Sequence, residues 1–292
     1  MIGLNSFTGY RFLSSCGSEY HVGGSCRKPL DLPGGVECVV ADLEPPQSLF
    51  SAIKNFEPDF VINTVAIGNV DYCEQNRAEA LAVNYEFPLS LAGFLRDEIP
   101  ACRLVHMSTN AVYDGDHAPY REDAKLAPLN HYGVTKARAD EALLREFPDA
   151  LIARPITMYG ISEDFQRANP LDFILKSLRQ GKAIRLVDDV YGNLLFLDDL
   201  IAAMLGLMRA GASGVYNVAG AERLNRYEFG LKVAEGFGLD AKLISPCDSS
   251  AFPSLARRPA DTTMDLSKIS NETGFRPRPI REVMQTLAGV AN

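Results

Sequence analysis

Short apolar runs alternate with longer amphipathic segments along the first half of the chain. The apolar runs predict strands over residues 20–24, 38–41, 60–66, 104–108 and 151–153. Apolar positions at helical spacing predict helices over residues 47–56, 77–96 and 132–146. Because parallel strands need long crossover connections, this alternation predicts an α/β fold with a doubly wound parallel sheet, whose ligands bind at the carboxyl ends of the strands.

The pattern is looser after about residue 160. Helical spacing returns over residues 171–180, 198–209 and 227–237, and a strand is predicted over residues 215–219. The C-terminal segment is rich in proline and arginine. We therefore predict two parts: residues 1–165 hold the parallel sheet, and residues 166–292 form a smaller lobe that is partly interleaved with it.

Composition narrows the class of protein. With 292 residues, 47% of them hydrophobic, the chain can bury a large core. The net charge is -8 and the basic residues are scattered, so no basic stripe indicates binding to nucleic acid or to an anionic membrane. The longest apolar stretches, such as residues 201–208, are much shorter than the roughly 18 residues of a membrane span, and no signal-peptide pattern opens the chain. We expect a cytoplasmic protein.

The cysteines and histidines give no sign of a metal site. The six cysteines show no Cys-x-x-Cys spacing, and the four histidines are isolated. This pattern predicts neither a bound metal nor a disulfide framework. Reduced, mostly buried thiols are expected.

Tyr132 and Lys136 lie four positions apart at the start of a predicted helix, so their side chains share one helical face. A cation near a phenol favours the phenolate and makes proton exchange with a substrate oxygen easier. The spacing alone is also compatible with an ordinary surface helix. Thr109 favours the chemical interpretation, because it follows the predicted strand over residues 104–108, where its hydroxyl is placed to hold a reacting carbonyl. We predict that Tyr132 is the acid or base, that Lys136 tunes it, and that Thr109 is the third catalytic member.

With these residues, the sequence resembles the extended short-chain dehydrogenase/reductases over nearly its whole length. The family's Ser/Thr, Tyr and Lys triad matches Thr109, Tyr132 and Lys136 in order and spacing. Further matches are Ala41-Asp42-Leu43, Asn84, Arg154-Pro155, Tyr159-Gly160 and Arg258-Pro259-Ala260-Asp261. The resemblance implies a Rossmann domain that binds a dinucleotide over residues 1–165, and a substrate-binding lobe over residues 166–292.

The resemblance also implies individual contacts. For the cofactor, these are Asp42 and Leu43 at the adenine, Val65 and Ala66 at the ribose and phosphates, Pro155 at the nicotinamide, and in addition Asn84, Tyr132 and Lys136. Thr109 and Asn110 would contact the substrate, and Arg258 matches an arginine that contacts the diphosphate of a sugar nucleotide. A guanidinium also suits phosphate oxygens on physical grounds, with a plain surface arginine as the alternative.

The glycine-rich loop of the family is imperfect in this chain. The run Gly3-Leu4-Asn5-Ser6-Phe7-Thr8-Gly9 keeps the outer two glycines, and Ser6 replaces the middle one, which would let the backbone approach a pyrophosphate. We expect Gly3, Ser6, Phe7, Thr8 and Gly9 to contact the cofactor, with the Ser6 hydroxyl on a phosphate oxygen. Only Met1 and Ile2 precede Gly3, where a strand of about five residues is expected. Either the chain as given begins late, or it has lost its first strand and binds the cofactor poorly.

The end of the second expected strand of the fold indicates which nicotinamide cofactor is used. An acidic residue there binds the ribose 2'-hydroxyl of NAD, whereas a basic residue accommodates the 2'-phosphate of NADP. Residues 23–28 end in Arg27 and Lys28 and contain no carboxylate. We predict NADP(H), with NAD(H) as the alternative, and Arg27 as the phosphate contact; solvated loop charges are the other interpretation.

Members of this family reduce, epimerise or dehydrate sugar nucleotides. The dehydratases carry Asp-Glu directly after the catalytic threonine, whereas Asn110 and Ala111 follow Thr109 here, so dehydration is not expected. Residues 109–115 resemble the corresponding segment of dTDP-4-dehydrorhamnose reductases, although Asn110 replaces their usual aspartate and residues 187–194 keep only part of their Asp-Gln-x-Gly-x-Pro-Thr pattern.

We therefore predict an NADPH-dependent reductase of a 4-keto nucleotide sugar. Two alternatives stay open. One is a nucleotide-sugar epimerase that retains its cofactor, and the other is a non-catalytic regulatory subunit on the same fold, like the beta subunit of methionine adenosyltransferase. The oligomeric state also stays open, a homodimer included.

Overall fold

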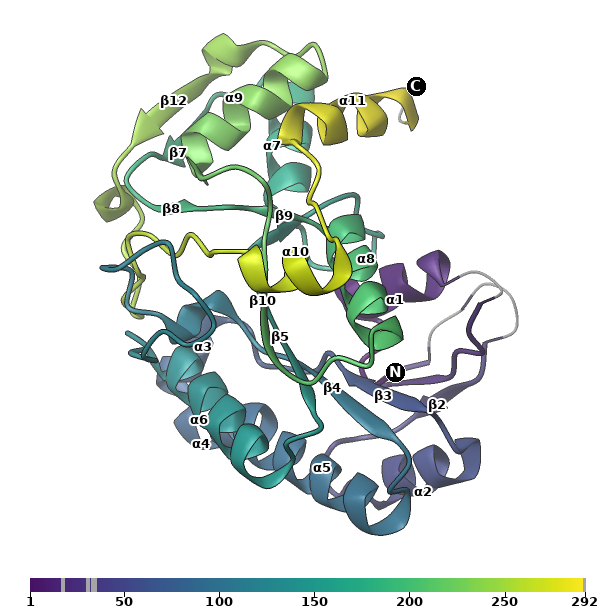
Figure 1. The fold of residues 1–292 in the computed structure, drawn as a ribbon. Coiled ribbons are helices and arrows are strands. Elements are labelled where there is room, and N and C mark those ends of the chain that lie inside the picture. The colour runs from purple at the N-terminus through teal and green to yellow at the C-terminus, as the bar shows by residue number, and fades with distance from the viewer. Residues whose placement is uncertain (17–18, 30–31, 33–35, 291–292) are drawn as a thin grey trace.

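One parallel sheet runs through the lower part of the molecule (Figure 1). The computed structural model describes residues 1–16, 19–29, 32 and 36–290. In spatial order, the sheet contains β2 (Cys38–Val40), β1 (Gly24–Cys26), β3 (Phe60–Asn63), β4 (Arg103–Met107), β5 (Leu151–Pro155) and β10 (Gly214–Val218), with Ile2 between β1 and β3. Each of these pairings is parallel. The α/β fold with a doubly wound parallel sheet is confirmed.

Ile2 lies inside this sheet, between β1 and β3. It forms parallel bridges with Ser25 and with Asn63, and its amide donates to the Ile62 carbonyl at 2.9 Å. The Ile2 side chain is buried in the core. Beside Met1, a cavity of about 680 Å³ lies between residues 20–25 and residues 58–62, at the amino ends of β1 and β3. In the described part of the chain, Ile2 alone therefore joins the strands β1 and β2 to the four strands β3, β4, β5 and β10. The chain turns toward its first helix directly after this residue.

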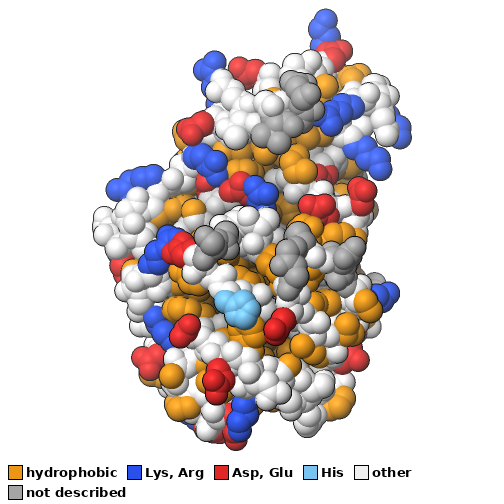
Figure 2. All heavy atoms as spheres, turned by 90° about the vertical axis from the view of Figure 1, so that its right-hand side faces the viewer, with side chains coloured by type: hydrophobic (Ala, Val, Ile, Leu, Met, Phe, Trp, Pro, Cys, Tyr) orange, Lys and Arg blue, Asp and Glu red, His pale blue; other side chains and the backbone are white. Residues whose placement is uncertain are grey.

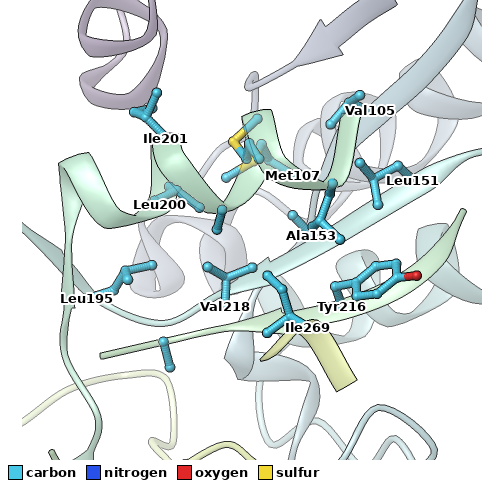
Figure 3. Packing of buried hydrophobic residues seen from close by; sticks show 14 of the residues in the cluster. Val105, Met107, Leu151, Ala153, Leu195, Leu200, Ile201, Tyr216, Val218 and Ile269 are labelled. Carbon is cyan, nitrogen blue, oxygen red and sulfur yellow. The ribbon is translucent and has the colours of Figure 1, made fainter. Parts of the chain in front are cut away.

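Helices cover both faces of the sheet, because alternate residues of each strand point to opposite sides. Leu104 and Ile152 pack in one cluster with α2 (Gln47–Phe56), α5 (Phe87–Glu98) and α6 (His131–Glu146). Val105 and Ala153 point to the other face, into a cluster with α1 (Phe7–Ser15) and α8 (Leu197–Arg209), and Figure 3 shows how α8 lies over these strands. The same cluster includes Ile269 of α10 (Ser267–Thr273), which contacts β10.

A second lobe lies above this sheet in Figure 1. Its short strands form three pairs: β7 (Ile184–Val187) with β12 (Ile244–Cys247), β8 (Tyr191–Gly192) with β11 (Leu224–Asn225), and β6 (Met158–Tyr159) with β9 (Leu195–Phe196). A separate apolar cluster joins α7 (Pro170–Arg179), α9 (Arg226–Gly236) and α11 (Ile280–Val290) to these strands. The chain returns from this lobe to the main sheet through α8 and β10. A boundary at residue 166 stays a prediction.

Several predicted elements match the structure closely. The helix predicted over residues 47–56 is α2, and the one over residues 132–146 is α6. The helix predicted over residues 77–96 is α4 (Arg77–Leu81), a π-helical turn η2 (Ala82–Glu86) and α5 in succession. None of the helices in the described part of the chain is long and apolar enough to cross a membrane.

The strand predicted over residues 20–24 is wrong, because β1 begins only at Gly24. Strand β1 begins where its backbone first finds partners on the two neighbouring segments. The Gly24 amide donates to the Glu37 carbonyl at 2.8 Å, and the Ser25 amide donates to the Met1 carbonyl at 2.9 Å. The ladders on both sides thus start at this point, and the β-prone composition of residues 20–23 does not extend them.

Candidate active site

The residues predicted to bind the cofactor lie at the carboxyl ends of neighbouring strands. They are Gly3 after Ile2, Arg27 after β1, Asp42 and Leu43 after β2, Val65 and Ala66 after β3, and Pro155 at the end of β5. Because these strands are parallel and adjacent, one edge of the sheet carries all of these residues. The cavity beside Met1 lies at the opposite edge and is separate from this candidate site.

The turn after Ile2 leads directly into helix α1. Ser6 caps this helix, because its hydroxyl accepts from the Gly9 amide at 2.9 Å, and it also lies 2.9 Å from the Thr64 hydroxyl. A Cβ at Gly9 would lie 2.4 Å from the Gly3 carbonyl oxygen, so the helix approaches the turn as closely as only glycine permits.

This turn fits an anionic group. The first amides of a helix have no partner within the helix, so those of Phe7 and Thr8 are free of the helical ladder and suit a phosphate. The Ser6 hydroxyl, predicted to contact a phosphate, is instead used inside the protein as the helix cap. The fit of the site to a pyrophosphate therefore depends on backbone amides.

Asn84 holds the loop that follows β3. It is fully buried in the π-helical turn η2. Its side-chain oxygen accepts from the Ile67 amide at 2.8 Å, and its side-chain nitrogen donates to the Ile67 carbonyl and to the Thr135 hydroxyl, each at 3.2 Å. These bonds fasten the loop that carries Val65 and Ala66 to helix α6. A direct contact of Asn84 with the cofactor stays a prediction.

The close approach of α6 to the turn after β4 brings Thr109 and Tyr132 together. Thr109 caps a 3-10 turn, η3 (Asn110–Val112), where its hydroxyl accepts from the Ala111 amide at 3.2 Å. A Cβ at Gly133 would lie 2.3 Å from the Ala111 carbonyl oxygen. Glycine next to Tyr132 therefore allows the helix to begin directly against the turn that carries Thr109.

The surroundings of the Tyr132 phenol change its pKa. Burial raises the pKa of Tyr132 above its usual value of 10.0, and the hydrogen bond with Thr109 opposes this rise. A phenol with these surroundings keeps its proton at neutral pH. It is therefore suited to give a proton to a nearby oxygen.

Lys136 is fully buried one helical turn after Tyr132. Its ammonium donates to the Met107 carbonyl at 2.7 Å and lies 2.9 Å from His106 Nε2. Burial lowers the pKa of Lys136 from 10.5 to about 8, and the charge of Asp140 opposes this fall. Burial also lowers the pKa of His106 well below 6.5, so its ring is neutral at neutral pH and can accept from the ammonium.

A buried ion pair lies near Lys136, which contacts His106. Arg154 and Asp140 are 2% and 0% exposed, and their Nε and Oδ2 atoms are 2.8 Å apart. The Ser108 hydroxyl donates to the same Asp140 oxygen at 2.9 Å, and Arg154 Nη1 donates to the Tyr113 hydroxyl at 3.0 Å. The pair joins helix α6 to strand β5 behind the three predicted catalytic residues.

Sequence reasoning missed His106 and Asp140 as parts of this site. Asp140 repeats the four-residue spacing that already relates Tyr132 to Lys136, so helical periodicity was a signal for it. His106 lies two positions before Ser108 in a predicted strand, which places both side chains on the same face. The partner of each residue depends on contacts between distant segments, which periodicity does not give.

Residues 258–262, near the C-terminus, contact the turn that follows β4. The Asn110 side chain donates to the Thr262 hydroxyl at 2.7 Å. Arg258 forms an ion pair with Asp71 of α3 (Val70–Gln75), with 3.4 Å between Nη2 and Oδ2, and the two side chains are 48% and 39% exposed. One short segment, residues 258–262, therefore connects the two residues predicted to contact the substrate. Arg258 begins this segment, and Asn110 contacts Thr262 at its other end.

Residues 165 and 166, where the chain enters the second lobe, contact helix α1 and the turn before it. The Gln166 side chain donates to the Ser6 carbonyl at 3.1 Å, and the Phe165 ring meets the Tyr10 ring edge to face, with 5.3 Å between their centroids. Residues from both parts of the chain therefore lie beside the turn over residues 3–6, at the carboxyl edge of the sheet.

Charged side chains are spread over the molecular surface. Figure 2 shows acidic and basic side chains interspersed on one face, without a continuous basic area. Arg27 and Lys28 are exposed after β1, and Asp42 is exposed after β2. Among the described residues, no group of three or more His, Cys, Asp or Glu side chains is placed to hold a metal ion. All six cysteines are free, three of them buried and three half-buried.

Comparison with known proteins gives a consistent result. The family of the RmlD substrate binding domain matches residues 17–291. A probable low-salt glycan biosynthesis reductase of Haloferax volcanii is 31% identical, covering 80% of this chain and 78% of its own length. A dTDP-4-dehydrorhamnose reductase of Mycolicibacterium smegmatis is 32% identical, covering 80% and 72%. A solved dTDP-4-dehydrorhamnose reductase of Bacillus anthracis, in complex with NADP, has a TM-score of 0.85 at 19% identity and covers 100% of this chain and 98% of its own.

Proposed function

Because the chain belongs to the family of the RmlD substrate binding domain, and is thus an oxidoreductase of the extended short-chain dehydrogenase/reductase type, we propose that it reduces a 4-keto nucleotide sugar with NADPH. The observation that carries this proposal is that helix α6, which carries Tyr132 and the buried Lys136, begins directly against the turn that carries Thr109. The names of the relatives support dTDP-4-dehydrorhamnose, or a sugar of the same class, as the substrate.

Reduction of a ketone adds a hydride to its carbon and a proton to its oxygen. The reduced nicotinamide supplies the hydride when it is bound. Tyr132 supplies the proton, since burial keeps its phenol protonated until a developing alkoxide lies beside it. The Thr109 hydroxyl donates a hydrogen bond to the same oxygen and holds it in place.

Lys136 completes the set as a buried positive charge. Its ammonium would stabilise the phenolate that Tyr132 becomes after proton transfer, and it is the residue that would hold the ribose next to the nicotinamide. Asp140 favours the charged form of Lys136, and His106 with the Met107 carbonyl orients it. The positive charge is therefore present before the cofactor arrives.

The remaining predicted residues bind the two ligands. The Phe7 and Thr8 amides, at the start of α1 after the turn framed by Gly3 and Ser6, would hold the pyrophosphate of the cofactor. Its other contacts are Asp42 and Leu43 at the adenine, Val65 and Ala66 at the ribose, Arg27 at the 2'-phosphate and Pro155 at the nicotinamide. Asn110 and Arg258 bind the substrate, with the Arg258 guanidinium leaving Asp71 for the sugar-nucleotide diphosphate.

The direct test is to mix the purified protein with NADPH and a panel of 4-keto nucleotide sugars that includes dTDP-4-dehydrorhamnose. We expect the absorbance of the reduced nicotinamide to fall with one or more of these sugars. Conversion of a sugar without net loss of NADPH indicates an epimerase, and unchanged sugars and unchanged NADPH across the panel contradict the proposed reduction.

The activity is expected to depend on pH through Lys136. Its pKa is lowered to about 8 by burial, so the lysine is charged below pH 8 and loses its proton as the pH rises through this value. Because kcat/KM reports groups of the free enzyme, kcat/KM for NADPH should be level below about pH 8 and fall about tenfold per pH unit above it. In Lys136→Arg, the charge persists at alkaline pH, so any residual activity should lack this fall. A fall that persists in Lys136→Arg contradicts the assignment.

Arg27 is expected to determine the preference for NADPH over NADH. Replacing it by alanine removes a charge-assisted contact with the 2'-phosphate, which costs about 1.5–3 kcal/mol, or a roughly tenfold to hundredfold rise in KM for NADPH. KM for NADH should stay unchanged, because NADH carries no such phosphate. Lys28→Ala, in the next exposed residue, is the matched control. An equal rise in KM for NADPH and for NADH in Arg27→Ala would show that Arg27 does not contact the 2'-phosphate.

A further inference from the structure

Two cysteines of the main sheet lie side by side. Cys26 ends strand β1 and Cys38 begins strand β2, and their Sγ atoms are 2.9 Å apart. In the parallel pairing, Cys26 lies opposite Val40 and Cys38 lies opposite Gly24. The two cysteines are thus two positions apart in register, which places both side chains on the same face of the sheet.

The two sulfur atoms are in direct contact, at a separation longer than that of a covalent bond. A disulfide has an S–S distance of about 2.0 Å, so closing the present gap requires a movement of about 0.9 Å. The other four cysteines lie in different elements: Cys16 at the end of α1, Cys73 in α3, Cys102 before β4 and Cys247 in β12. Cys26 is 2% exposed, whereas Cys38 is half-buried, so a reagent from solution meets Cys38 first.

We propose that Cys26 and Cys38 are a site of reversible oxidation that forms a disulfide bond within the chain. The oxidant is a low-molecular-weight disulfide such as glutathione disulfide. The Cys38 thiolate attacks it, releases one glutathione thiol and becomes a mixed disulfide. The Cys26 sulfur then attacks the Cys38 sulfur and releases the second glutathione thiol. Two protein thiols are oxidised and one glutathione disulfide is reduced, so the two electrons balance.

The first step is expected to be slow near neutral pH. Burial raises the pKa of Cys38 to about 12, with the neighbouring Cys26 adding to the rise, so few molecules carry the reactive thiolate at pH 7. The rate of disulfide formation should therefore increase about tenfold per pH unit over the range from 7 to 9. The second step is fast in comparison, because its two sulfurs are already in contact.

The disulfide also affects the cofactor, a consequence that rests on the proposed function. Arg27 directly follows Cys26, and drawing the end of β1 toward β2 moves the backbone that carries this guanidinium. A charge-assisted contact depends on such placement. We expect oxidation to raise KM for NADPH severalfold and to leave kcat at saturating NADPH unchanged, since Thr109 follows β4 and Tyr132 lies in α6, away from β1 and β2.

The test uses the full chain without cofactor or substrate. The protein is equilibrated in glutathione buffers from fully reduced to fully oxidised, then denatured and alkylated, and its mass and peptides are measured. We expect four of the six thiols to be alkylated in the oxidised buffer, a loss of two hydrogens, and one linked peptide pair that contains Cys26 and Cys38. Dithiothreitol should restore all six. Because no turnover is involved, this result does not depend on the reductase activity.

Three variants make the result specific. Cys38→Ser and Cys26→Ala should abolish the linked peptide, whereas Cys247→Ser, at a half-buried cysteine of the second lobe, should keep it. Six alkylated thiols in every buffer, a stable glutathione adduct on Cys38, or a linked pair of other cysteines each overturns the proposal. If the disulfide forms and KM for NADPH does not change, the link to Arg27 is wrong and the oxidation site stands.

Discussion

Replacing Tyr132 by phenylalanine is expected to lower kcat for reduction of the 4-keto sugar by about 10²–10⁴-fold, the usual contribution of a positioned general acid. The change removes one hydroxyl and keeps the ring, so helix α6 and its approach to the turn after β4 should persist. KM for NADPH should change little, because the phenol acts on the substrate oxygen. Steady-state kinetics with NADPH and the active sugar measure kcat and KM for NADPH. Circular dichroism shows whether the variant is folded.

The matched control is Tyr20→Phe. Tyr20 lines the cavity at the amino ends of the strands, at the opposite edge of the sheet from Thr109. Removing its hydroxyl should leave kcat unchanged. A folded Tyr132→Phe variant with wild-type kcat would show that another group supplies the proton.

Replacing Arg154 by methionine is expected to lower the free energy of unfolding by about 3–5 kcal/mol, since it removes the direct ion-pair partner of a buried carboxylate. Arg154 and Asp140 are 2% and 0% exposed, and Asp140 Oδ1 has no hydrogen-bond partner among the described residues. In the variant, the carboxylate therefore keeps only the hydrogen bond from Ser108 and the charge of Lys136. Urea unfolding of the variant and of the wild type measures the difference.

A surface ion pair of the same chain provides the control. Arg209 and Glu19 are both about half exposed, so Arg209→Met should change the free energy of unfolding far less than Arg154→Met does. The double variant Arg154→Met, Asp140→Leu should recover part of the loss, because it removes both charges. A cost below about 1 kcal/mol for Arg154→Met, or a double variant as unstable as the sum of the single ones, contradicts a tightly coupled pair.

The main helices could be predicted from the sequence because their apolar spacing directly reflects burial. The helix over residues 47–56 places Leu49 and Ile53 on its buried side, one turn apart. The beginning of β1 could not be predicted, because it depends on pairing with Met1 and Glu37 from other segments. Two-residue strands such as β8 and β11 are too short to have a period at all.

The same limit applies to the candidate site. The expected positions of Thr109, Tyr132 and Lys136 follow from a strand end and one helical face, and the structure places Thr109 after β4 and the other two in α6. Their catalytic roles stay predictions. The role of Ser6 as a helix cap depends on the Gly9 amide and Thr64, and the position of Lys136 depends on His106. Contacts of this kind join segments that are far apart in the chain, so they appear only once the fold is known.

The most direct test of the proposed reduction uses NADPH that carries deuterium at the transferable position of the nicotinamide, with the active 4-keto nucleotide sugar as substrate. Mass spectrometry and proton NMR of the product are expected to show one deuterium on the former ketone carbon and one NADP⁺ formed for each sugar reduced. A converted sugar without deuterium at that carbon, or deuterium that stays in the cofactor, would contradict hydride transfer to the ketone.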